Sequence, residues 1–263
     1  AYEKIAADAV ARYHRLAGDD TRFVMGADEH SQNVEKAARR EGMEPLAYCD
    51  MMAARFTKVW SALDISFDDF IRTTEARHAR SVAALFSRIE AAGDIYKGFY
   101  EGWYCVGCEA FKVEKDLEDG LCPIHHTKPD WIQEENHFFT LSRYQDRLLE
   151  YYRDHSEFLV PAERKNEILN VLRSGLEDIS ITRAGSTWGI PLPSDPKQVV
   201  YVWFDALINY LSAVGHGDDS AEGRALLEKW WPADLHIIGK DITRFHCIIW
   251  PAMLMSAGLP LPV

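Results

Sequence analysis

Three cysteines and one histidine stand at spacings that suit a tetrahedral metal ion. Cys105 and Cys108 enclose two residues, and after thirteen more residues Cys122 is followed at the same spacing by His125. Thiolate and imidazole are ligands that zinc prefers, and a closed set of four leaves no position open for water. We therefore predict a structural Zn²⁺ site. The open alternatives are His126 as the fourth ligand, and disulfides or free thiols, which leave the histidine unexplained.

Ionisable side chains follow a predicted strand near the N-terminus. Residues 21–26 form the strand, and Asp28, Glu29 and His30 come directly after it. Ligands of open parallel sheets bind at the carboxyl ends of the strands, so these side chains are candidates for ligand contacts. The alternative is that an aspartate or serine there only caps the helix that we expect near Ser31.

Two later segments combine strand patterns with aromatic or charged groups. We predict a strand over residues 199–204 that runs into a helix over residues 206–214, where aromatic side chains can line an apolar pocket or form an ordinary core. A second strand is predicted over residues 235–238. It is followed by Gly239, which admits a close ligand, and by charged residues before a helix from Thr243. Helix starts favour anions, but the spacing is not that of a Walker loop, so the phosphate signal is weak.

These groups must be positioned by an alternation of helices and strands. Helical patterns are predicted over residues 5–16, 31–40, 75–92 and 141–152, and after Pro45 and Pro161, with short strands near 65–71 and 179–182. The alternation favours an α/β fold with a parallel sheet. Residues 95–140 lack a helical period and predict an inserted small β-rich module. We expect a first domain part at 1–94, the module at 95–140 and a second domain part at 141–263.

The composition limits what the chain can bind. Of 263 residues, 41 are acidic and 29 are basic, and the net charge of −12 repels phosphate backbones and anionic membranes. Any nucleic-acid contact must therefore be local. The apolar residues 247–263 include three prolines, so we predict a buried helix and a loop rather than a membrane span. No secretory signal pattern is present, and we expect a cytoplasmic protein, with a mitochondrion or plastid as the alternative.

Taken together, these segments resemble the methionyl-tRNA synthetases, a family of class I aminoacyl-tRNA synthetases, along essentially the whole chain. Residues 1–8 are similar to the helix after the family's HIGH signature, 26–30 to its T-D-E-H segment, and 101–125 to the zinc knuckle of its single-zinc members. The remaining catalytic-domain blocks are matched by residues 179–183, 201–206, 238–241, 245–246 and 250–254.

The resemblance implies a fold and a reaction. The fold is a doubly wound parallel-sheet domain, Rossmann-like, with the zinc module inserted as part of the connective peptide. In the reaction, L-methionine and ATP with Mg²⁺ form methionyl-adenylate and pyrophosphate, and methionine is then transferred to tRNA(Met). Because no enzyme nucleophile is needed, catalysis would rest on positioning and on charge stabilisation. The tRNA contacts are expected mostly in segments that this chain lacks.

The resemblance also assigns the methionine site. Asp28 would hold the α-ammonium through a charge-assisted contact. The side-chain pocket would be formed by Trp203, Ala206, Leu207, Tyr210, Phe245 and His246. An aromatic slot suits a polarizable thioether, because sulfur against a ring edge gains about 0.3–1.5 kcal/mol. Leu207 departs from the family, since many relatives carry proline there.

The ATP site follows from the same resemblance. The predicted contacts are Glu3, His236, Gly239 and Asp241, with Asp241 accepting from ribose hydroxyls and Gly239 admitting the adenosine. Arg183 matches a basic residue near the substrate carboxylate and phosphate, where a guanidinium favours bidentate contact. Arg183 and Asp241 are therefore the predicted catalytic residues.

The sequence also departs from the family in its extent. It contains neither the HIGH signature nor the KMSKS loop, and no anticodon-binding helical domain. We expect a fragment of the catalytic domain that binds methionine and adenylates it feebly. One alternative is another class I synthetase, for leucine, isoleucine, valine or cysteine. The other is a non-catalytic zinc-knuckle binding module on an α/β scaffold, for which small ligands would give no stabilisation.

Overall fold

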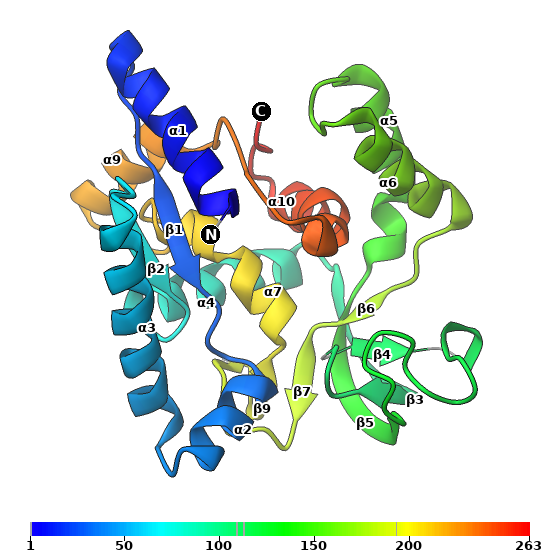
Figure 1. The fold of residues 1–263 in the computed structure, drawn as a ribbon. Helices are drawn as coiled ribbons and strands as arrows, with labels where there is room; N and C mark the ends of the chain where they lie inside the picture. The colour runs from blue at the N-terminus through cyan, green and yellow to red at the C-terminus, as the bar shows by residue number, and fades with distance from the viewer. Residues whose placement is uncertain (1, 109, 113, 193) are drawn as a thin grey trace.

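The first third of the chain alternates helices with two parallel strands (Figure 1). The computed structural model describes residues 2–108, 110–112, 114–192 and 194–263. Its first elements are α1 (Tyr2–Ala17), β1 (Val24–Ala27), α2 (Gln32–Arg40), α3 (Pro45–Ala62), β2 (Asp69–Arg72) and α4 (Ala76–Ala91). β1 and β2 pair in parallel, with Val24 opposite Asp69. Parallel strands need a long crossover, which α2 and α3 supply.

Ser31 caps the helix that follows β1. Its side chain accepts a hydrogen bond from the backbone N–H of Val34 at 3.1 Å, at the start of α2. Asp28 instead accepts a hydrogen bond from the side chain of Asn209. The serine therefore fills the capping role that the sequence left open, and the carboxylate of Asp28 lies in a different environment.

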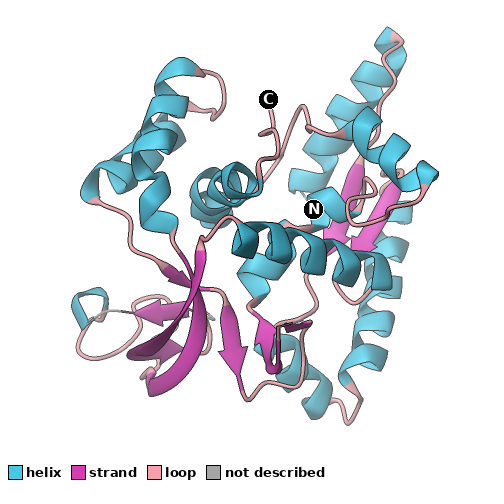
Figure 2. Ribbon diagram, turned by 180° about the vertical axis from the view of Figure 1, so that it is seen from behind, coloured by secondary structure: helices cyan, strands magenta, loops and turns pink. Residues whose placement is uncertain are grey.

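The segment predicted to be a β-rich module contributes three strands to an antiparallel sheet (Figure 2). Its strands are β3 (Ile95–Cys105), β4 (Ala110–Lys112) and β5 (Asp130–Phe139), and β6 (Ile179–Ser180) adds to the edge in the order β4-β3-β5-β6. β3 and β5 pair over their whole length, from Ile95 opposite Phe139 to Tyr104 opposite Asp130. Both ribbon views place this sheet apart from the pair of β1 and β2.

The second half of the chain is mostly helical, with one further small sheet. The sheet has the order β7-β9-β8, and its pairs are antiparallel. The remaining elements are η1 (Glu114–Asp116), η2 (Leu141–Tyr144), α5 (Gln145–Asp154), α6 (Ala162–Ser174), β7 (Thr182–Ala184), β8 (Pro191–Leu192), β9 (Asp195–Val200), α7 (Val202–Leu207), α8 (Asn209–Ser212), α9 (Ala221–Trp230), η3 (Lys240–Ile242), η4 (Phe245–Ile249) and α10 (Trp250–Ala257).

The predicted strand over residues 199–204 is wrong in its second half. β9 ends at Val200, and Tyr201 is the extended residue before α7. The carbonyl of Tyr201 accepts hydrogen bonds from the N–H groups of Phe204 and Asp205, both at 2.9 Å, which closes a helical turn. Aromatic residues favour strands, but this local bonding places Trp203 on a helix.

The strand predicted over residues 235–238 is also wrong. These residues form no strand in the described part of the chain. Among the described residues, β1 and β2 make a sheet of two strands, and 235–238 belongs to none of the sheets. An apolar run becomes a strand only where a neighbouring edge supplies hydrogen-bonding partners. The helix expected from Thr243 forms as the π-helical turn η4 followed by α10.

The main core joins α4, the base of the β3–β5 sheet and the helices of the second half of the chain. The Phe204 ring on α7 packs edge-on against Phe86 of α4 and Phe139 of β5, with centroid distances of 6.2 Å in both pairs. Trp250 and most of α10 are buried in the same cluster, as predicted for residues 247–263. None of the helices in the described ranges is long and apolar enough to cross a membrane.

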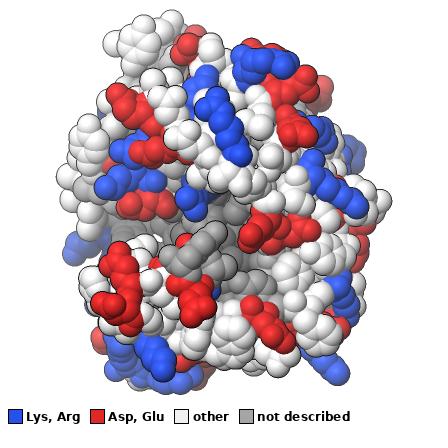
Figure 3. All heavy atoms as spheres, turned by 90° about the vertical axis from the view of Figure 1, so that its right-hand side faces the viewer, with Lys and Arg blue, Asp and Glu red and all other residues white. Residues whose placement is uncertain are grey.

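The outer face of the module carries both signs of charge. On the side at the right of Figure 1, acidic and basic side chains are interspersed (Figure 3). Where Figure 3 shows described residues, basic side chains alternate with acidic ones and form no extended stripe for a phosphate backbone. Local contacts with nucleic acid, as expected from the net charge, remain compatible with this face.

Candidate functional site

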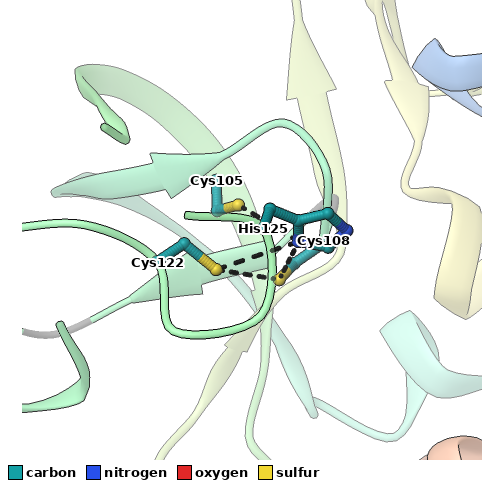
Figure 4. Close-up of side chains that lie close together, drawn as sticks. All are labelled: Cys105, Cys108, Cys122 and His125. Carbon is teal, nitrogen blue, oxygen red and sulfur yellow. Dashed lines mark hydrogen bonds between the residues drawn. The ribbon is translucent and has the colours of Figure 1, made fainter. Parts of the chain in front are cut away.

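The four predicted metal ligands lie together at one end of β3. The sulfurs of Cys105, Cys108 and Cys122 and a ring nitrogen of His125 all lie within 4.8 Å of one another. Cys108 Sγ lies 3.3 Å from His125 Nδ1 and 3.5 Å from Cys122 Sγ (Figure 4). The described cysteines are free thiols rather than disulfides. Three sulfurs and one imidazole in this arrangement can hold one metal ion.

His125, and not His126, belongs to the cluster. His126 has a φ of 51° and donates its backbone N–H to the carbonyl of Cys122 at 2.7 Å. The His125 ring packs directly over Gly107, where an added Cβ would lie 2.5 Å from the ring. Gly107 therefore permits the close approach of the imidazole to the sulfurs.

The thiols of the cluster differ in acidity. Burial disfavours the thiolate of Cys122, but hydrogen bonds from the backbone N–H and ring of His125 and from Ile124 outweigh it and lower the pKa to about 6. Burial and the neighbouring thiols raise the pKa of Cys108 to about 12. One thiolate thus forms readily, and a cation is needed to offset the charge of the others.

A second group of predicted residues surrounds Asp28, directly after β1. Asn209 Nδ2 donates to Asp28 Oδ1 at 3.2 Å. Asp28 is an exposed residue. Burial of the carboxylate among protein atoms, together with the charge of Asp205, nevertheless raises its pKa to about 6. Asp28 is therefore a carboxylate that gains from a cationic partner.

Two stacked ring pairs include the predicted pocket residues, and Tyr210 of one pair lies close enough to Asp28 to be affected by its charge. Trp203 stacks on Phe245 with a centroid distance of 4.1 Å, and Tyr210 stacks on His236 at 4.1 Å. The hydroxyl of Tyr210 lies 2.6 Å from Nε2 of His246. Together the rings form an aromatic cluster contributed by α7, α8 and the segment from 236 to 246.

The hydrogen bonds of His246 fix its tautomer. Nδ1 lies 3.0 Å from the carbonyl of Ile242, which can only accept, so Nδ1 carries the proton. Nε2 of the neutral ring then accepts from the hydroxyl of Tyr210. Burial lowers the pKa of His246, and burial lowers that of His236 to about 4. The aromatic cluster is therefore uncharged at neutral pH.

The remaining pocket candidates differ in their surroundings. Ala206 and Leu207 on α7 are both buried, and Leu207 belongs to the main core beside Phe204. A Cβ added to Gly239 would lie 3.8 Å from a carboxylate oxygen of Glu3, so the start of α1 adjoins that glycine. Asp241 follows in η3 and is exposed.

Arg183 has a different environment from Asp241. Its guanidinium lies 4.0 Å from the centre of the Tyr201 ring and donates to Ser180 Oγ at 2.9 Å. Arg183 is buried and lines a small recess together with His30. The two residues predicted to be catalytic therefore occupy different surroundings in this structure.

A family model matches this chain along its whole length. The model of the family described as "tRNA synthetases class I (M)" matches residues 1–125 and 112–263. The chain belongs to the class I (M) tRNA synthetases. Because the two matched ranges together cover the whole chain, the inserted module belongs to the family pattern as well as the flanking parts.

The chain is similar to methionine–tRNA ligases of several bacteria. That of Thermotoga maritima is 50% identical over 266 residues, which cover 100% of this chain and 42% of the relative. That of Nostoc sp. is 49% identical over 264 residues, covering 100% and 50%. This class I (M) synthetase chain therefore spans about half the length of its curated relatives.

Solved structures confirm the predicted class I synthetase fold. The Mycobacterium tuberculosis methionyl-tRNA synthetase bound by methionyl-adenylate matches with a TM-score of 0.94 and 46% identity, over 99% of this chain and 52% of that one. Its apo form matches with a TM-score of 0.84 and 44% identity, over 99% and 50%.

Two polar residues of this synthetase fold, Asp205 and Asn209, are not among the predicted site residues. Asp205 is fully buried between His30 and His78, and Asn209 holds Asp28. Both lie in an apolar, aromatic run, where acidic and amide side chains are rarely buried without partners. Polar side chains within an apolar, aromatic run are therefore the sequence signal that points to these two residues.

We expect Tyr210→Phe to destabilise the chain by about 0.5–1.5 kcal/mol, because it removes the hydrogen bond to the half-buried Nε2 of His246. Urea denaturation measures the free energy of unfolding. Tyr13→Phe is the matched control, since Tyr13 is exposed and the change should stay within about 0.5 kcal/mol. Equal losses in the two variants would contradict the bond to His246.

Proposed function

We propose that this chain is part of the catalytic domain of a methionine–tRNA ligase. The observation that carries the proposal is the placement of the Asp28 carboxylate, held by Asn209, beside Tyr210 of an uncharged aromatic cluster. A free amino acid with an apolar side chain matches this site, because its ammonium can contact the carboxylate while its side chain contacts the rings. The similarity to a synthetase bound by methionyl-adenylate, over 99% of this chain, supports methionine as that amino acid.

In this proposal, the two ends of methionine are recognised separately. The carboxylate of Asp28 pairs with the α-ammonium, and Trp203, Tyr210 and the residues beside them receive the thioether. A thioether is apolar and polarizable, so it gains from ring edges and from the absence of charge. The neutral state of His236 and His246 at physiological pH keeps the slot suitable for it.

The nucleotide would bind beside Gly239 and the start of α1, which adjoin each other. Gly239 offers backbone without a side chain, and Asp241 and Glu3 are carboxylates that can accept from ribose hydroxyls. The carboxylate of methionine would attack the α-phosphate of ATP, and pyrophosphate would leave. Mg²⁺ bound to ATP would neutralise part of the phosphate charge. A terminal ribose hydroxyl of tRNA(Met) would then attack the carbonyl of the adenylate and AMP would leave, with Arg183 and Asp241 as the proposed catalytic residues.

The cysteine cluster would hold a structural Zn²⁺ ion. Three thiols and one imidazole complete a tetrahedral set, and the lowered pKa of Cys122 favours the first metal–thiolate bond. In the proposed domain organisation, residues 95–140 are the connective module, and residues 1–94 and 141–263 form the catalytic part. The ion would hold the loops beyond β3 without taking part in the reaction.

We expect L-methionine to raise the thermal midpoint of the chain, by mass action of a ligand that binds the folded state. L-leucine and L-isoleucine should have no comparable effect. Trp203→Ala should abolish the response, because it removes one ring of a stacked pair. Trp131→Ala is the matched control on the exposed face of the module. Stabilisation by leucine as strong as that by methionine would overturn the proposal.

We expect the affinity for methionine to fall as the pH decreases through about 6. The pKa of Asp28 is raised to about 6, so below that value its carboxylate is protonated and loses the attraction for the ammonium. Titrations followed by tryptophan fluorescence between about pH 5 and 8 measure the dissociation constant. Asp28→Asn should bind weakly at every pH, without this transition. A parent chain with the same affinity at both ends of the range would contradict the role of Asp28.

We expect His125→Ala to weaken Zn²⁺ binding at least about tenfold and to lower the thermal midpoint, because a metal ligand is lost. His126→Ala should retain the metal, since that side chain lies outside the cluster. Metal content after dialysis against a chelator measures the difference. Retention of zinc by His125→Ala and its loss by His126→Ala would reverse the assignment.

A further inference from the structure

Asp205 is a fully buried carboxylate. Its Oδ2 lies 2.8 Å from Nδ1 of His30, and its Oδ1 lies 2.6 Å from Nε2 of His78. An ionised carboxylate only accepts, so both ring nitrogens donate to it. These bonds outweigh the cost of burial and hold the pKa of Asp205 below its usual value. The carboxylate of Asp205 is therefore charged at neutral pH and accepts two hydrogen bonds.

The hydrogen bonds continue from Asp205 through three further elements. Nδ1 of His78 on α4 lies 2.9 Å from Oγ of Ser212, which in turn bonds the carbonyl of Ile208 at 2.9 Å. The network thus joins the loop after β1 with α4, α7 and α8. If residue 205 only filled space in the core, an apolar side chain would stabilise the fold at least as well as this buried carboxylate.

The network lies between the two halves of the proposed methionine site. His30 is two residues after Asp28, and Asp205 is two residues after Trp203. On the other side of His30, the ring of Trp188 packs edge-on at 5.4 Å. The bond from His30 to Asp205 therefore sets the distance between the loop that carries Asp28 and the helix that carries Trp203.

We propose that Asp205 is a positioning residue for the amino-acid site, acting through His30. This inference rests on the proposed function. Asp205 has no surface that a substrate could reach, so it acts only through its partners. Its bond to His30 holds Asp28 in register with the aromatic cluster, and its bond to His78 anchors both to α4.

Asp205 also acts on Asp28 through its charge. Burial contributes most to the raised pKa of Asp28, and Asp205 on α7 adds to it, whereas His78 on α4, Asn209 on α8 and Lys4 on α1 lower it. Removing the charge of Asp205 should therefore lower the pKa of Asp28. The transition in methionine affinity would then move to lower pH, an effect that loss of packing alone would not produce.

The test measures methionine affinity and its pH transition in the 263-residue chain. In Asp205→Asn the dissociation constant for L-methionine should rise about 10- to 100-fold at neutral pH, because a small misplacement of binding groups has an effect of that size. The transition should lie below that of the parent. Asp130→Asn, an exposed change on β5, is the control and should match the parent in both measurements.

Two substitutions of His30 keep the inference testable if Asp205→Asn fails to fold. His30→Leu removes one bond and leaves the pair of Asp205 and His78 intact, and it should lose methionine affinity to a similar extent. His30→Asn places an amide N–H where Nδ1 lies and should retain most of the affinity. Equal affinities in parent, His30→Leu and Asp205→Asn would overturn the inference alone. A parent chain that does not bind methionine would overturn the proposed function itself.

Discussion

A carboxylate buried away from water is tolerated only where donors surround it, and this constraint organises the centre of the fold. Asp205 satisfies it with His30 and His78, which come from elements far apart in the sequence. The loop after β1, the helix α4 and the helix α7 must therefore meet at one point. The proposed methionine site lies at that meeting point, since Asp28 and Trp203 are both close neighbours of the trio in the chain.

The site that results separates charge from apolar surface. Burial acts in opposite directions on its titratable groups, raising the pKa of Asp28 and lowering that of His236 and His246. The same physical effect thus creates a carboxylate that gains from an ammonium and a ring cluster that stays neutral. A ligand with a cationic end and an apolar end matches both, as an amino acid such as methionine does.

The inserted module depends on a second, independent set of contacts. Its cysteine cluster lies at one end of β3, and the other end of the strand enters the core beside Asp94. The buried carboxylate of Asp94 accepts from Thr140 at 2.9 Å and from Ser256 of α10 at 2.7 Å. The base of the module is thereby joined to the helix that also carries Trp250.

The sequence by itself determined the metal-ligand spacing, most helices and the β-rich character of the segment after residue 95, because these depend on local patterns, and the family through motifs in order along the chain. It indicated Asp28 and the aromatic residues only through a resemblance to a family. Tertiary structure decided that His125 rather than His126 faces the sulfurs, that Trp203 lies on a helix, and that Asp205 joins two histidines. Hydrogen-bond partners contributed by distant elements are invisible to periodicity, and a buried polar group has meaning only once those partners are placed.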